Sequence, residues 1–213
     1  HNGGTVEQPI DFPDLEAFGN NNYTKELDDL EAIIDWLYNN TEIKEIGDIY
    51  NLSLIGHSRG GGIVSIKAEE DSRIKSVVTL AGVCDFAKRT ATIGDLESWK
   101  TEGVKYVLNG RTKQQMPHFY QFYEDFIANE NRFNIQRAVS KLKIPHLIIH
   151  GNNDTSVFLT EAENLHAWNP QSQLEIIEGS NHVFGANHPW DHDFLPEHLI
   201  MAVNKVITFL KEK

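Results

Sequence analysis

One pentapeptide, GHSRG at positions 56–60, has the residue types and spacing that suit nucleophilic catalysis. It follows an apolar run at 51–57 and precedes a stretch, 63–68, that favours a helix. A tight turn between a strand and a helix presents its serine hydroxyl at the carboxyl edge of a sheet. We expect side chains in place of either glycine to collide with the backbone of so tight a turn. The pattern predicts a nucleophile elbow with Ser58 as the nucleophile.

The helix that begins at this turn aims its first N–H groups and the positive end of its dipole at the serine. The residue after the nucleophile supplies an oxyanion donor in such an elbow. We therefore expect the backbone N–H of Arg59 to stabilise the developing negative charge.

A serine hydroxyl is a weak nucleophile and needs a base, which a third group orients. Asp154 follows the apolar run 144–151, and His182 follows the run 173–179. The order Ser, Asp, His is the one expected when all three lie beyond the carboxyl ends of parallel strands. These residues therefore predict a catalytic triad in which His182 is the base and Asp154 orients it.

Each of these residues also has an ordinary structural interpretation. The G-x-S-x-G pattern occurs by chance in many proteins. An aspartate among glycine and asparagine is usually a turn residue, and a histidine after a strand is more often a capping or surface residue. The triad prediction depends on all three residues falling in the right order at one sheet edge.

Strand and helix signals alternate along the chain. This alternation predicts an α/β fold with a mostly parallel sheet that helices flank on both faces. The predicted strands are 51–57, 74–82, 144–151 and 173–179, and the predicted helices are 24–39, 63–68, 160–168 and 197–211.

About sixty residues between the second and third strands carry no strand signal and are rich in aromatic residues. So long a segment favours an insertion with its own structure over a bare loop. We expect 1–83 and 141–213 to form the core and 84–140 to form a helical lid. Its aromatic side chains could line a substrate pocket or form the lid's own small core.

Composition excludes several classes of protein. The chain has 213 residues and a net charge of −12, and a surface this acidic repels nucleic acid. No apolar run is long enough to span a bilayer. Cys84 is the one cysteine, so an intramolecular disulfide and a cysteine-based zinc site are excluded. The single thiol leans towards a reducing compartment, which favours a cytoplasmic location.

The segments GHSRGG, LIIHGNNDTSV and EGSNHVFGANHPW together closely resemble the α/β-hydrolase superfamily. The nearest likeness is to its esterase branch, which includes cinnamoyl esterases and prolyl-oligopeptidase-like hydrolases. The resemblance covers nearly the whole chain. It implies hydrolysis of a small-molecule carboxylic ester through an acyl-enzyme, without a cofactor, by Ser58, Asp154 and His182. A peptidase or thioesterase of the same fold is an alternative.

The chain departs from the resemblance at its amino end. The superfamily usually places the nucleophile after the fifth strand, whereas here it follows the first, so the fold is expected to be N-terminally truncated. The family's second oxyanion donor has no convincing equivalent, and HNGG at 1–4 has the wrong position. A weak or inactive remnant is therefore a further alternative. The strand at 51–57 would lose a neighbour, and we expect a homodimer to cover that edge.

We predict structural roles, and no chemistry, for the other polar residues. We expect His57 to pack in the elbow, and His146 and His150 to be structural residues of a strand. His188, Asp191, His192 and Asp193 have side chains suited to a metal, but prolines mark their segment as a loop before the last helix, so we expect no metal site.

Overall fold

The computed structural model describes residues 3–8, 10–187 and 189–212, and the chain divides into two compact units. The hairpin unit contains residues 1–35 and 86–133, and the sheet unit contains residues 36–85 and 134–213. Ser58, Asp154 and His182 all belong to the sheet unit.

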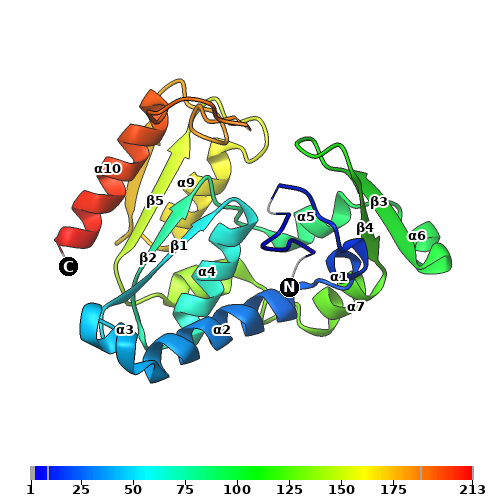
Figure 1. Ribbon diagram of the computed structural model, residues 1–213, viewed down its shortest axis with the longest axis horizontal. Coiled ribbons are helices and arrows are strands. Elements are labelled where there is room, and N and C mark those ends of the chain that lie inside the picture. Colours follow the sequence, from blue (N-terminus) through cyan, green and yellow to red (C-terminus); the bar gives the residue numbers. More distant parts are fainter. Residues whose placement is uncertain (1–2, 9, 188, 213) are drawn as a thin grey trace. The chain divides into compact units, whose positions relative to one another are not determined.

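The sheet unit is built on four parallel strands in the order β1-β2-β5-β6 (Figure 1). All four predicted strands are confirmed, and so is the α/β class with a parallel sheet. The strands are β1 (Leu52–His57), β2 (Ile74–Leu80), β5 (His146–Gly151) and β6 (Gln173–Ile177).

Helices cover both faces of this sheet. Val78 and Leu147 are paired in register and pack with α10, whereas the neighbouring Thr79 points to the opposite face, where Gly61 of α4 lies. Helix α8 packs against both α4 and α9, so these three helices lie on that second face. The helices are α3 (Thr41–Ile46), α4 (Arg59–Glu70), α8 (Ile135–Lys141), α9 (Leu159–Trp168) and α10 (Glu197–Lys211).

The main core of the sheet unit lies between the sheet and α10. Its apolar side chains alternate along the strands and recur at helical spacing along α10, so both elements bury one face. The cluster consists of Val78, Ala81, Leu147, Ile149, Ile177, Phe184, Ala202, Val206 and Phe209.

The hairpin unit combines short helices with a two-stranded antiparallel sheet. Helix α2 (Tyr23–Asn39) begins in this unit and ends in the sheet unit. The other elements are α1 (Leu15–Gly19), α5 (Phe86–Ala91), α6 (Leu96–Glu102), β3 (Val104–Leu108), β4 (Gln115–Phe119) and α7 (Gln121–Ala128). None of the helices in the described ranges is both long and apolar enough to cross a membrane.

The insertion contains the helices α5, α6 and α7, as predicted, but β3 and β4 also form a hairpin within it, which the prediction did not include. Asn109 organises the turn: its side-chain oxygen accepts hydrogen bonds from the N–H groups of Arg111 and Thr112. Its own N–H donates to the carbonyl of Gln114, which closes the loop. The Asn-Gly pair at 109–110 is a general turn signal, but the loop spans 109–114 and neither residue has a positive φ, so this is not the two-residue hairpin turn that such a pair favours.

The predicted boundaries of the insertion also differ from the structure. Residues 1–35 were expected in the core, but they form one unit with residues 86–133. Tyr23 gives the physical reason. It is 1% exposed and stacks on Phe86, with ring centroids 4.1 Å apart, and it also contacts Phe122 and Phe133.

Several of the inserted aromatic residues form the unit's own core. Trp99, Phe122 and Phe126 are all buried, and the indole N–H of Trp99 donates to the carbonyl of His118 in β4. For these three residues the internal-core interpretation holds. Tyr106, by contrast, is exposed.

The buried His146 makes the stability of the sheet unit depend on pH. Desolvation, with a smaller contribution from His166, lowers the pKa of His146 from 6.5 to about 4. Between these values the unfolded chain binds a proton that the folded chain does not. Folding stability is therefore lost as the pH falls from about 6.5 towards 4.

We expect His146→Leu to remove this pH-dependent component, which amounts to roughly 3 kcal/mol across the full window. The measurement is the urea-derived free energy of unfolding of both proteins at pH 7, 6, 5 and 4.5. Parallel pH profiles for the wild type and the variant would contradict the assignment of this component to His146.

Candidate functional site

Ser58 lies on the turn between β1 and α4 with φ 55° and ψ −122°, a backbone conformation that non-glycine residues rarely adopt. Three hydrogen bonds hold it there. Its N–H donates to the carbonyl of Leu80, and its carbonyl accepts from the N–H groups of Gly61 and Val83. The strained turn is thus fixed to β2 and to the loop after β2, as a nucleophile elbow requires.

Close packing explains one of the two glycines of the elbow but not the other. A Cβ on Gly56 would lie 2.2 Å from the carbonyl oxygen of Gly60, so only glycine fits. A Cβ on Gly60 would meet nothing within 4 Å, and the expectation that Gly60 avoids a collision is therefore wrong. The second crowded position is Gly61, whose Cβ would lie 2.7 Å from the Cα of Gly82.

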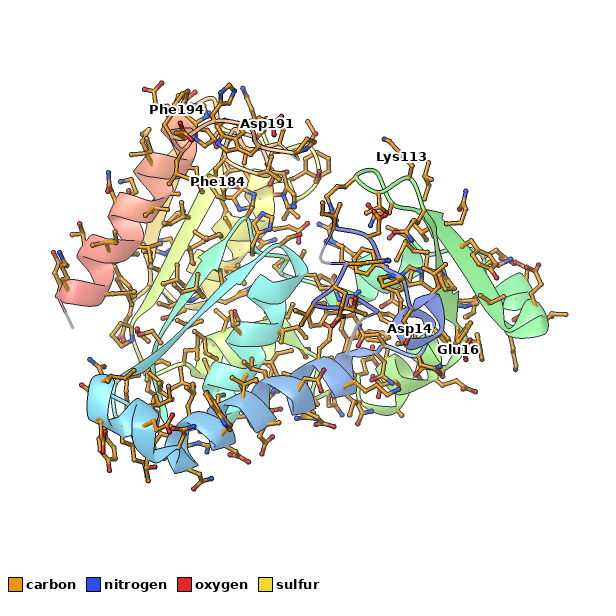
Figure 2. The ribbon with its side chains drawn as sticks, in the orientation of Figure 1. Asp14, Glu16, Lys113, Phe184, Asp191 and Phe194 are labelled. Atoms are coloured by element: carbon orange, nitrogen blue, oxygen red, sulfur yellow. The ribbon has the colours of Figure 1, made fainter. Side chains whose placement is uncertain are left out.

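His182 lies in the loop that follows β6, at the same carboxyl edge of the sheet as Ser58. Its Nε2 is 3.0 Å from the Oγ of Ser58. Phe184, labelled in Figure 2, anchors this loop because its side chain is buried in the core cluster that also contains Ile149 and Ile177. The imidazole is therefore held by its loop at hydrogen-bonding distance from the hydroxyl.

Asp154 lies in the loop between β5 and α9, and its Oδ2 is 2.7 Å from the Nδ1 of His182. A carboxylate accepts, so Nδ1 carries the proton and Nε2 is free to accept from Ser58. The other oxygen, Oδ1, accepts from the backbone N–H groups of Ser156 and Val157. The structure thus brings Ser58, His182 and Asp154 together in one hydrogen-bonded chain.

The surroundings of Asp154 favour its ionised form. Desolvation by burial raises its pKa, but the hydrogen bonds from Val157, His182 and Ser156 outweigh that effect, and the net pKa lies below 3.8. The side chain is fully buried. An ionised carboxylate that faces Nδ1 stabilises the imidazolium that forms when His182 accepts a proton.

His57 belongs to the elbow and touches the site without joining the hydrogen-bonded chain. Its Nε2 lies 2.8 Å from the backbone oxygen of His182, so this nitrogen donates. The two rings are 4.7 Å apart. Desolvation lowers the pKa of His57, and the hydrogen bond to His182 partly offsets this. The expectation that His57 packs in the elbow agrees with these contacts.

Arg59 is the first residue of α4 and directly follows Ser58. The structure places its backbone where an elbow supplies its oxyanion donor, and that role stays a prediction. For the segment HNGG, residues 1 and 2 lie outside the described residues. The carbonyl of Gly3 accepts a hydrogen bond from the N–H of Asp14.

The remaining polar candidates lie elsewhere. His188 lies outside the described residues. In the parts of the chain that are described, no group of three or more suitable side chains could hold a metal. His192 instead stacks on Phe194, and Cys84 is a buried free thiol. His150, expected to be a structural residue of its strand, also lies beside the site: its side chain is fully buried, and its Nε2 lies 3.4 Å from Oδ2 of Asp154.

The fold and the arrangement at the sheet edge define an α/β hydrolase. The profile of the prolyl oligopeptidase family, Peptidase_S9, matches residues 10–195. The chain belongs to this family. No curated protein sequence matches it significantly.

Solved structures with the same fold include several esterases. Est1E from Butyrivibrio proteoclasticus has a TM-score of 0.64 and 19% identity over 91% of this chain and 72% of its own. A putative hydrolase from Agrobacterium vitis S4 has a TM-score of 0.67 and 18% identity over 91% of this chain and 70% of its own. The esterase domain of a Rhodothermus marinus protein has a TM-score of 0.52 and 21% identity over 78% of this chain. The present chain spans 62% of that domain's length. At these identities the likeness shows the fold alone.

The two glycines of the elbow give a matched test of its geometry. We expect Gly56→Ala to lower the free energy of unfolding by at least about 2 kcal/mol, because the added methyl group overlaps the Gly60 carbonyl. Gly60→Ala should change stability by less than about 1 kcal/mol, because space is available and alanine favours a helix. Urea unfolding of both variants measures the difference, and equal losses would contradict this account of the elbow.

Proposed function

We propose that this protein is a serine hydrolase that cleaves carboxylic esters through an acyl-enzyme. The observation that carries the proposal is the continuous chain of hydrogen bonds from Asp154 through His182 to Ser58, at 2.7 and 3.0 Å. This arrangement can remove the proton of a serine hydroxyl as the oxygen attacks a carbonyl carbon. The strained backbone of Ser58 supports the same proposal.

The proposed reaction has two halves. Oγ of Ser58 attacks the ester carbonyl while Nε2 of His182 takes the hydroxyl proton, and the Arg59 N–H stabilises the oxyanion. His182 then gives its proton to the departing alcohol, which leaves an acyl group on Ser58. A water molecule, deprotonated by the same imidazole, attacks this acyl-enzyme, and His182 returns the proton to Oγ of Ser58 as the acid leaves.

The substrate we propose is a small or medium carboxylic ester with an aryl portion. One of the solved structures with the same fold is Est1E with ferulic acid bound, which is an aryl acid held by that protein. This neighbour supports the proposal at the level of substrate class. A peptidase is the second candidate, since the chain belongs to the prolyl oligopeptidase family. Relative rates on a p-nitrophenyl ester, an acyl-CoA and an aminoacyl p-nitroanilide separate ester, thioester and peptide activities.

Labelling with a fluorophosphonate tests the nucleophile. We expect the wild-type protein to be labelled and Ser58→Ala to escape labelling, because the reagent reacts with an activated serine. Ser53→Ala, which removes another hydroxyl from β1, is the control and should be labelled like the wild type. Asp154→Asn should lower kcat on the ester by about 10⁴-fold, because it disturbs the tautomer of His182. A wild-type protein that is neither labelled nor active would favour an inactive remnant.

We also propose that a second copy of the chain pairs with β1. Among the described strands β1 contacts only β2, so its other edge can accept a strand. Ile55 of β1 is 49% exposed, although its register partner Val78 in β2 is fully buried. Pairing with β1 of a second copy, related by a two-fold axis, would give the unpaired backbone groups of this edge hydrogen-bond partners. It would also cover Ile55.

Light scattering tests this proposal. We expect a mass of about twice 24.2 kDa at micromolar concentration. Ile55→Lys should produce a monomer, because it places a charge in the buried interface. Ile176→Lys, at a similarly exposed position on β6 at the other sheet edge, is the control and should leave the dimer intact. A wild-type monomer would overturn the proposal.

A further inference from the structure

The carboxylate of Asp154 has a second imidazole neighbour that the proposed reaction does not use. His150 lies near the end of β5, paired in register with Ile176 of β6. Its side chain is fully buried, as is that of Asp154. His150 precedes Asp154 by four residues, and the chain turns back between them so that Nε2 of His150 lies 3.4 Å from Oδ2.

The hydrogen bond of His150 to Val157 shows which ring nitrogen carries a hydrogen. Nε2 lies 2.8 Å from the carbonyl oxygen of Val157, and a carbonyl can only accept, so Nε2 carries a hydrogen. Nδ1 is buried and has no hydrogen-bond partner in the described part of the chain. A second N–H at Nδ1 would be buried without an acceptor, which is costly. The contacts therefore place a ring hydrogen on Nε2.

Val157 is held from both sides by these contacts. Its N–H donates to Oδ1 of Asp154 at 2.9 Å, and its carbonyl accepts from His150. The loop that carries Asp154 is thereby closed into a ring of hydrogen bonds from β5, through Val157, back to the carboxylate. The same Nε2–H also faces Oδ2, the oxygen that accepts from His182.

We propose that His150 is a positioning residue for the reaction, one that fixes the Asp154 loop so that Oδ2 meets Nδ1 of His182. This inference rests on the proposed function. His150 acts only through Asp154 and touches neither the hydroxyl nor the base. Loss of its Nε2–H releases Val157, lets the carboxylate drift, and weakens the orientation of the imidazole at the moment of proton transfer.

The sharpest test compares two substitutions at position 150 with one at position 146. His150→Leu removes the donor, and His150→Gln keeps an amide N–H close to the position of Nε2. His146→Leu is the matched control, because His146 is equally buried on the same strand but its Nε2 faces Thr79 instead of the Asp154 loop. Circular dichroism at pH 8 first shows that all variants are folded. Their kinetics are then measured at the same pH on a p-nitrophenyl ester.

We expect His150→Leu to lower kcat about 10- to 100-fold with KM changed less than twofold, because a small misplacement of the orienting group impairs the chemical step. His150→Gln should recover at least a third of the wild-type kcat. His146→Leu should stay within threefold of the wild type. Equal losses for His150→Leu and His146→Leu, or a Gln variant as slow as the Leu variant, would overturn the positioning role.

A measurement on the wild-type protein keeps the inference testable if His150→Leu fails to fold. Nitrogen-15 NMR of the histidine rings reports which nitrogen carries the hydrogen. We expect a hydrogen on Nε2 of His150, and a ring with its only hydrogen on Nδ1 would overturn the proposal. Fluorophosphonate labelling of the wild type and Ser58→Ala separates the two failures. If labelling follows Ser58 but His150→Leu is fully active, only the role of His150 fails.

Discussion

The hydrogen bond between the carboxylate of Asp154 and Nδ1 of His182 is the contact on which the candidate site depends. It fixes the ring so that Nε2 faces Ser58, and it requires two loops from different strands to meet at one edge of the sheet. The parallel register of β1, β2, β5 and β6 makes this meeting possible, because it brings all four carboxyl ends to the same edge.

Burial of a charged group must be compensated, and here the compensation also positions the group. Two backbone N–H groups satisfy Oδ1 of Asp154, and His182 satisfies Oδ2. The loop conformation that supplies these donors is closed by His150. The same hydrogen bonds that keep the carboxylate ionised therefore also aim it, so stability and proposed catalysis depend on one set of contacts.

The sequence predicted the parts of the fold that follow from simple periodicity and chain order. Four apolar runs gave the strands, and the elbow motif located Ser58, because both signals are local. The insertion was harder. Its hairpin has short strands, and the turn signal at Asn109 was not recognised. The grouping of Tyr23 with Phe86 and Phe133 joins segments that are distant in sequence, and no local pattern indicates it. The contact of His150 with Asp154 likewise depends on how a loop folds back.

The central claim is that Ser58 becomes covalently acylated during turnover. Rapid acid quench of the protein with an excess of a p-nitrophenyl ester, followed by peptide mass spectrometry, tests it most directly. The account predicts an adduct with the mass of the acyl group on the peptide that contains Ser58, and no adduct in Ser58→Ala. An acyl group on another residue, or undiminished ester hydrolysis by Ser58→Ala, would contradict the account.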